Sequence, residues 1–179
     1  MNPYFNQPIS KFEKVRPRLN QFKYKDVSFY IYVYLNPFKP ARSLYKLPNG
    51  EHIEFAFEPI YIGKGTNSHT DEKFRSGYRM NQHIAEYLKS NVGNEEIDGR
   101  IIHNEFKRRA FKDLELNMLK LGHSHSDYPR NWDEYKNNWI IVLNDYPTAQ
   151  ALEAAEKNYI RGIGTLRRGT GPLVNALLG

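Results

Sequence analysis

The chain has 179 residues and carries 26 Lys and Arg against 20 Asp and Glu, which gives a formal net charge of +6. This length suits one domain with its own hydrophobic core, and the basic excess favours a polyanionic partner without naming it. The sequence contains no cysteine, which excludes disulfide frameworks, thiolate zinc sites and cysteine nucleophiles. It contains neither an apolar signal segment nor a membrane-length stretch, so we expect a cytoplasmic protein without membrane contacts.

The N-terminal region differs in composition from the rest of the chain. Residues 1–27 contain three prolines among basic and aromatic residues and show no lasting period, which predicts an irregular arm. The arm either wraps the domain, contacts a partner or is a disordered tail. We expect the domain itself to occupy residues 28–179.

The first strand of the domain is expected directly after this arm. FYIYVYL (29–35) is rich in β-branched and aromatic residues, a composition typical of a buried strand. Asn36 and Pro37 follow it, and such residues commonly end a strand. The sequence therefore predicts a strand that stops at residue 36.

A hairpin and a second short strand are expected next. Asn49 and Gly50 lie between two semi-alternating runs, and these residue types tolerate the positive φ angles of a type I′ turn. They predict an inserted hairpin with Asn49 and Gly50 at its centre. PIYIG (59–63) then predicts a short strand, closed by Gly63 and Gly65.

The second half of the chain alternates helical and strand-like patterns. Residues 78–90 and 100–121 repeat apolar positions at helical spacing, and the second segment forms one long helix or two. WIIVL (139–143) predicts a third strand after an irregular excursion over 122–138. Thr148 is a suitable N-cap for the alanine-rich helix that follows it. Three strands interleaved with helices predict a small α+β domain.

The hexapeptide IYIGKG (60–65) is compatible with several kinds of site. A phosphate-binding P-loop needs a longer glycine spacing and a Ser or Thr after the lysine, whereas Gly65 follows Lys64 here. A dinucleotide-binding fingerprint needs a third glycine that opens a helix. The hexapeptide alone therefore leaves a catalytic strand, a small-molecule site and a plain turn as alternatives.

Five segments in a fixed order favour the catalytic strand among these alternatives. Together they resemble the motif set of the GIY-YIG nuclease family. The resemblance departs from the family in two ways, since the first motif reads YIY and the gap between the two tyrosine motifs is long. The segments are YIYVYLNP (30–37), YIGKG (61–65), GYRMNQH (77–83), EKNYIRGIG (156–164) and PLVN (172–175).

The resemblance implies a fold and a reaction. The expected fold is a small three-stranded antiparallel sheet flanked by helices, here with the inserted hairpin and the N-terminal arm. The expected reaction is hydrolysis of DNA phosphodiester bonds with one divalent cation, Mg²⁺ or Mn²⁺ in its place. Double-strand cleavage would involve a homodimer. The restriction or phage type of enzyme fits better than an intron-homing one, because no separate DNA-reading module follows the domain.

The family motif assigns two tyrosines and a lysine to the reacting centre. Tyr32 and Tyr61 are expected to lie together on neighbouring strands, where one of them, as phenolate, takes a proton from water. The pKa of an unperturbed tyrosine is about 10, so a cation must lower it, and Lys64 and the metal are the expected suppliers.

The remaining predicted residues bind phosphate or metal. Arg79 offers a forked donor for the scissile phosphate, and Arg75 is its rival nearby. His83, one helical turn after Arg79, either binds phosphate, relays a proton or is a plain surface histidine.

Glu156 is the expected Mg²⁺ ligand, with Glu153 on the same helix face as its rival. Asn175 resembles the closing asparagine of the family, which either helps to fix the site or contacts the DNA backbone. Four further basic residues are either solvated or contact phosphates: Lys107, Arg108, Arg167 and Arg168.

Two other functions remain open at this point. The first is a basic module with the same fold that binds nucleic acid without cutting it. The second is a small-molecule enzyme that uses the YIGKG turn to bind a nucleotide.

Overall fold

The computed structural model describes residues 27–68, 78–91, 105–120, 135 and 139–175. In this part of the chain, a three-stranded antiparallel sheet is accompanied by helices, which confirms the predicted α+β class. The arm predicted for residues 1–27 lies outside the described residues except for Val27, which begins the first strand. Of the excursion over 122–138, the structure describes only Tyr135. None of the helices in the described ranges is long and apolar enough to cross a membrane.

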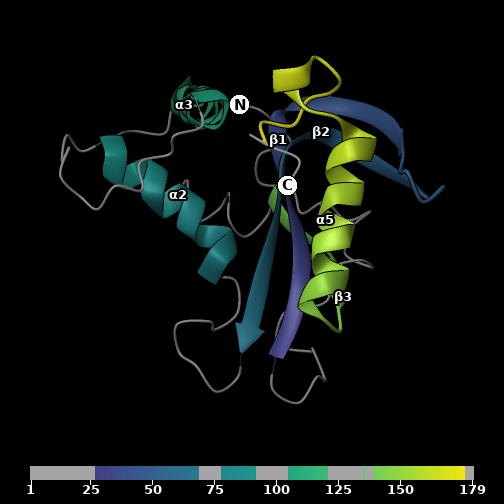
Figure 1. Cartoon of the computed structure of the whole chain (residues 1–179). Helices are drawn as coiled ribbons and strands as arrows, with labels where there is room; N and C mark the ends of the chain where they lie inside the picture. Colours follow the sequence, from purple (N-terminus) through teal and green to yellow (C-terminus); the bar gives the residue numbers. More distant parts are fainter. Residues whose placement is uncertain (1–26, 69–77, 92–104, 121–134, 136–138, 176–179) are drawn as a thin grey trace.

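The sheet is built on one long hairpin of β1 (Val27–Lys46) and β2 (His52–Ser68), as Figure 1 shows. The strand ends predicted at residue 36 and at Gly63 are therefore wrong, because both strands continue past these positions. The predicted inserted hairpin is not a separate unit. It is the far half of the same two strands.

The prolines of β1 are accommodated by irregular pairing. The register with β2 shifts between Asn36 and Pro40 and again between Pro40 and Ser43. β3 (Ile140–Tyr146) pairs antiparallel with β1 only over Phe29–Tyr34, so the far half of β1 has β2 as its one described neighbour. Proline lacks the N–H of a ladder bond and is tolerated at bulges and unpaired edges. Pro37 and Pro40 therefore bend β1 without ending it.

The hairpin turn differs from the predicted type I′ turn. Its closing hydrogen bond runs from the Gly50 N–H to the Leu47 carbonyl over 2.9 Å, so Pro48 and Asn49 are the central residues. Gly50 follows them with a φ of 88°. Pro48 restricts the first central residue to negative φ, and this rules out the type I′ geometry. The result is a three-residue loop with a glycine in the left-handed region.

Gly63 and Gly65 lie inside β2 and make room for tyrosine rings. Tyr32 pairs with Gly63 and Tyr30 pairs with Gly65 across the hairpin. A Cβ at Gly63 would lie 2.3 Å from Cζ of Tyr32, and one at Gly65 would lie 2.3 Å from Cζ of Tyr30. These glycines are therefore required for space and do not terminate the strand.

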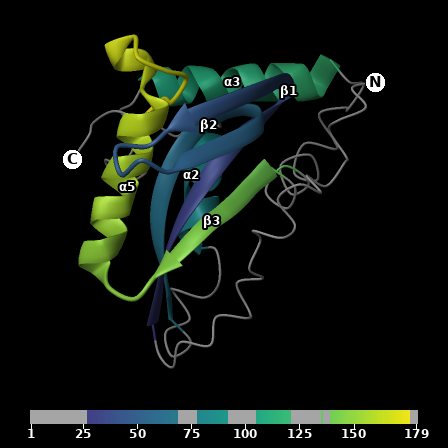
Figure 2. The same ribbon diagram turned by 90° about the vertical axis from the view of Figure 1, so that its right-hand side faces the viewer.

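Helices cover the two faces of the sheet. α2 (Tyr78–Asn91) lies on one side of the hairpin and α5 (Ala149–Ile163) on the other, as Figures 1 and 2 show. α3 (Glu105–Lys120) contacts α2 and β1. The predicted N-cap is confirmed, because Thr148 Oγ1 accepts a hydrogen bond from the Ala151 N–H over 3.1 Å. After α5, the short η4 helix (Leu166–Arg168) leads to the C-terminal segment.

The core has a different composition on each face of the sheet. On the α3 side it is aromatic, and the ring of Tyr34 stacks on Phe111 with 5.8 Å between centroids. Tyr135 lies edge-on to Tyr34 and donates its hydroxyl to the Leu35 carbonyl over 2.8 Å. To the other face, α5 contributes the buried aliphatic residues Leu152, Ile160 and Ile163 and the partly buried Tyr159. Alternation along the strands thus places the tyrosines of β1 on the face of α2 and α3.

Candidate active site

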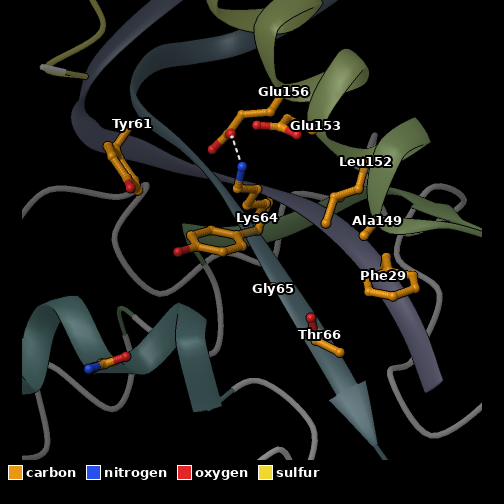
Figure 3. Close-up of a pocket in the computed structure, with 11 residues that line it drawn as sticks. Phe29, Tyr61, Lys64, Gly65, Thr66, Ala149, Leu152, Glu153 and Glu156 are labelled. Atoms are coloured by element: carbon orange, nitrogen blue, oxygen red, sulfur yellow. Dashed lines mark ion pairs between the residues drawn. The ribbon is translucent and has the colours of Figure 1, made fainter. Parts of the chain in front are cut away.

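A cavity of about 520 Å³ lies at the outer edge of β2 (Figure 3). It extends from the N-terminal half of α5 around the edge of the strand to α2. Four of the six residues predicted to be catalytic line it: Tyr32, Tyr61, Lys64 and Glu156. The fold therefore brings together most of a set that the sequence distributes over three segments.

These residues approach the cavity from opposite faces of the sheet. Tyr61 pairs with Tyr34, whereas Lys64 pairs with Ile31, so their side chains point to opposite faces. Tyr61 belongs to the aromatic face with α2, and Lys64 to the face covered by α5. β2 is the edge strand, and Gly63 and Gly65 add no side chains to it at this point. The cavity reaches both faces around that edge.

On the α5 side, Lys64 and Glu156 form an ion pair with 3.0 Å between Nζ and Oε2. The Lys64 side chain is 43% exposed and that of Glu156 is 18% exposed. Glu153 lies one turn earlier on α5 and lines the same cavity (Figure 3). Its side chain is more exposed than that of Glu156. The partly desolvated carboxylate is thus the one that the lysine neutralises.

On the opposite face, Tyr61 lies between a buried imidazole and a buried ammonium group. The ring of His83 is edge-on to that of Tyr61, with 5.0 Å between centroids. Nζ of Lys107 lies over the Tyr61 ring, 3.9 Å from its centroid. Both neighbours are 6% exposed. Lys107 is therefore neither solvated nor placed to contact a phosphate, and His83 is not a plain surface histidine, because the packing of α2 and α3 on this face encloses both side chains.

Tyr32 and Tyr61 lie together as predicted, with 6.3 Å between ring centroids. Their exposure differs, since Tyr61 is partly exposed while Tyr32 has no exposed surface and forms the floor of the cavity. Tyr34 is also fully buried, and this burial raises the pKa of its phenol well above the usual value, with smaller contributions from Tyr135 and Tyr61. Of these three tyrosines, Tyr61 is the one open to solvent.

Asn175 holds β2 next to Tyr61. Its amide oxygen accepts from the Ile62 N–H over 3.1 Å, and its amide nitrogen donates to the Ile62 carbonyl over 2.7 Å. The Val174 N–H also donates to the Ile60 carbonyl over 2.7 Å. Asn175 is 6% exposed. Of its two predicted roles, this geometry fits the one of fixing the site, because both ends of the amide bond to the strand.

The predicted arginines are placed less completely. Arg79 lies in the first turn of α2, but its side chain, like the whole of Arg75, is outside the described residues. Arg108 is exposed on α3. Arg167 and Arg168 are exposed on η4, beyond the C-terminal end of α5.

The cavity offers oxygen ligands for a hard cation. Glu156 and Glu153 supply carboxylates and Thr66 a hydroxyl. In the described ranges, no group of three or more His, Cys, Asp or Glu side chains is placed to hold a metal ion. Mg²⁺ keeps several of its waters and needs only one or two carboxylates. Glu156 and Glu153 thus supply the carboxylates that a small hard cation requires, and such a cation would replace Lys64 at Glu156.

Two residues of the cavity were given no role from the sequence, and Lys107 was given a different one. Gln82 lies within GYRMNQH and Thr66 directly follows YIGKG, but the resemblance singles out neither of these two cavity residues. Lys107 gave a usable signal, because it lies in helical phase with Phe111 and the other buried residues of α3. A lysine at a core position of an amphipathic helix indicates a buried partner for its charge.

The strand geometry also bears on the nucleotide alternative. YIGKG is extended backbone within β2, paired with β1 throughout. A phosphate-cradling loop requires consecutive N–H groups turned toward one point, so the YIGKG turn postulated for a nucleotide enzyme is absent from this strand.

Comparison of the chain with family models, with curated proteins and with solved structures found no match.

Proposed function

We propose that this protein is a divalent-metal-dependent DNA endonuclease related to the GIY-YIG nucleases. The observation that carries the proposal is the cavity at the edge of β2, which Tyr61 and Lys64 of that strand share with Glu156 from a distant part of the chain. The three-stranded antiparallel sheet supports it, since this is the sheet that the family resemblance implies. The net charge of +6 supports a polyanionic substrate.

In this proposal Tyr61 is the general base. Its phenolate takes a proton from water while the water oxygen attacks phosphorus and the bond to the 3′ oxygen breaks. Tyr61 suits this role because it is partly exposed and lines the cavity. Tyr32 is fully enclosed, so its contribution is to the floor of the site.

The charged residues of the cavity hold the phosphate and the cation. Glu156, with Glu153 beside it, would bind Mg²⁺ or Mn²⁺. When bound, the cation supplies positive charge to the phosphate oxygens. Lys64 is 43% exposed and has room to turn from Glu156 toward a phosphate. Arg79 would add a forked donor from α2, and Arg108, Arg167 and Arg168 would contact the DNA backbone.

A module that binds DNA without cutting it is the second candidate. The observation that favours it is the Lys64–Glu156 ion pair, in which each charge already neutralises the other. A non-cleaving protein needs no cation at Glu156, and its lysine would remain in the pair. The two candidates thus differ in whether a metal replaces Lys64 at the carboxylate.

Plasmid cleavage tests both candidates. Purified protein is incubated with supercoiled plasmid and Mg²⁺ or Mn²⁺, with EDTA as the metal-free control. We expect nicked or linear product only with metal. Tyr61→Phe should lower the rate by about 10² to 10⁴-fold, the usual contribution of a general base.

Matched variants test the metal assignment. Glu156→Gln should abolish cleavage, and Glu153→Gln, one turn away on the same helix, should reduce it less. The reverse order would move the metal ligand to Glu153. Plasmid that stays intact at every salt and metal concentration contradicts the endonuclease, and a salt-dependent gel shift without nicking favours the binding module.

A further inference from the structure

Lys107 is a charged residue at a core position. It lies on the side of α3 that also carries the buried residues Phe111, Leu114 and Met118. A lysine is rarely buried to this extent unless its ammonium group interacts with a partner. The structure supplies one, because Nζ lies 3.9 Å from the centroid of the Tyr61 ring.

Among the described residues, Lys107 is the cation that lies against the ring of Tyr61. His83 from α2 lies edge-on to the ring and is 3.5 Å from Oε2 of Glu86, so its charge depends on protonation. Tyr32 and Tyr34 of β1 contribute aromatic rings at this face. Lys64, the cation expected from the sequence, points to the opposite face and pairs with Glu156. Lys107 is therefore the ammonium group that the described structure places against the ring.

An ammonium group over a tyrosine ring favours the ionised form. The negative charge of a phenolate is shared between its oxygen and the ring carbons, so a cation above the ring attracts the phenolate more strongly than the neutral phenol. The interaction is enhanced here because Lys107 is 6% exposed and little screened by water.

We propose that Lys107 is a positioning residue that stabilises the phenolate of Tyr61 and thereby prepares it to accept the proton of the attacking water. The inference rests on the proposed function of Tyr61 as a base. The step balances, since the phenolate oxygen gains the proton that water loses when it bonds to phosphorus, and the departing 3′ oxygen is protonated by solvent.

The test measures the ionisation of Tyr61 directly in the full-length, metal-free protein. Ring-¹³C tyrosine spectra are recorded from pH 7 to 12, and Tyr61→Phe identifies the Tyr61 signal. Lys107→Met, which keeps the length of the side chain without its charge, should move the titration midpoint of Tyr61 upward by about 1 to 3 pH units. Lys107→Arg should restore most of the wild-type midpoint. Lys112→Met, on the exposed side of the same helix, should leave it unchanged.

Cleavage provides a second readout with the same variants. If the phenolate is the active form, the rate at neutral pH falls about tenfold for each pH unit by which the midpoint rises. Lys107→Met should therefore move the rising limb of the pH–rate profile to higher pH and recover its rate there. A merely structural role would lower the rate equally at every pH.

Each outcome decides one question. An unchanged Tyr61 midpoint in folded Lys107→Met overturns the inference, whether or not the protein cuts DNA. A raised midpoint in a protein that cuts no DNA supports the coupling and contradicts the endonuclease. Should Lys107→Met not fold, the coupling is measured from the other side, because the ammonium group of Lys107 must titrate at lower pH in Tyr61→Phe than in the wild type. Identical Lys107 titrations in those two proteins overturn the inference.

Discussion

At the scale of single residues, the site shows how neighbours give different properties to one residue type. Tyr34 and Tyr61 are cross-strand partners with 5.7 Å between ring centroids. Burial raises the pKa of Tyr34, so its phenol stays neutral. Tyr61 is partly open and has an ammonium group over its ring. Two tyrosines in contact thus have different surroundings, and only Tyr61 has those that its proposed role as a base requires.

Asn175 gives a prediction at the same scale. Asn175→Ala removes both partners of Ile62 and leaves a buried N–H and a buried carbonyl unsatisfied. We expect the free energy of unfolding to fall by about 2 to 4 kcal/mol, measured by urea denaturation. Asn158→Ala, which removes an exposed bond to the Asn49 N–H, should cost less than about 1 kcal/mol. Equal losses in the two variants would contradict the role of Asn175 in holding β2.

At the scale of elements, the hairpin of β1 and β2 carries the candidate site. The half of the hairpin that adjoins β3 contributes the tyrosines, Lys64 and the two glycines. The other half leads to the turn at Gly50. α5 packs against both strands and brings Glu156 to the cavity. The C-terminal segment then pairs with the outer edge of β2 at Ile60 and Ile62. The described part of that segment ends at Asn175, opposite Ile62, and the cavity lies further along β2 at Lys64 and Gly65.

Gly63 provides a test of this arrangement. A Cβ added to Gly63 meets the ring of Tyr32, which cannot move without disturbing the neighbouring tyrosines. Gly63→Ala should lower the free energy of unfolding by about 1 to 3 kcal/mol, the usual cost of overpacking. Leu44→Ala, at a side chain that is 66% exposed on the same hairpin, serves as the control and should change it by less than about 0.5 kcal/mol. A neutral Gly63→Ala would show that the ring is displaced easily.

At the scale of the whole molecule, the distribution of basic residues bears on the salt dependence of DNA binding, and the ionisation of tyrosines bears on stability at high pH. Residues 157–175 carry four Lys and Arg and no Asp or Glu, which concentrates positive charge around the end of α5 and η4. In the part of the chain that the structure describes, four tyrosines have a raised pKa, in each case chiefly because burial disfavours the phenolate: Tyr34, Tyr135, Tyr146 and Tyr159. Both features lead to measurable predictions.

The basic end of α5 should contribute to the salt dependence of DNA binding. Arg167→Ser with Arg168→Ser removes two exposed cations. The slope of log K against log salt should become shallower by about 1 to 2, because each phosphate contact contributes about 0.9. Arg42→Ser with Lys46→Ser makes the same change of net charge on the far half of the hairpin. An equal change in slope for both double variants would indicate an effect of net charge alone.

The buried tyrosines predict a loss of stability in alkali. Since the folded state raises their pKa, their contribution is complete below about pH 10, where tyrosines ionise in the unfolded chain. It is lost as the pH rises from there toward the folded values, by up to about 1.4 kcal/mol per pH unit for each group. Urea unfolding between pH 8 and 12 should show this decline. Tyr34→Phe removes one of the ionising groups, so the free energy of unfolding should fall less steeply with pH, by the contribution of one proton. An unchanged slope would contradict the raised pKa of Tyr34.

Parts of this architecture were accessible to prediction from local signals. The three strands, α2 and the Thr148 N-cap follow from periodicity and capping chemistry, which act within a few residues. The strand ends were missed because proline and glycine are read as terminators. Whether they terminate a strand depends on the neighbouring strand, and here bulges absorb Pro40 while the tyrosine rings occupy the space above Gly63 and Gly65.

The sequence by itself determined the α+β class, because alternation and composition report on single strands and helices. The expectation that Tyr32 and Tyr61 lie together came from the family resemblance. Only the tertiary structure decided which side chains share a face. It placed Lys64 with Glu156, buried Asn175 against Ile62 and brought Lys107 over Tyr61. The physical reason is that these contacts join segments far apart in the chain, and their geometry is set by how helices pack on a twisted sheet.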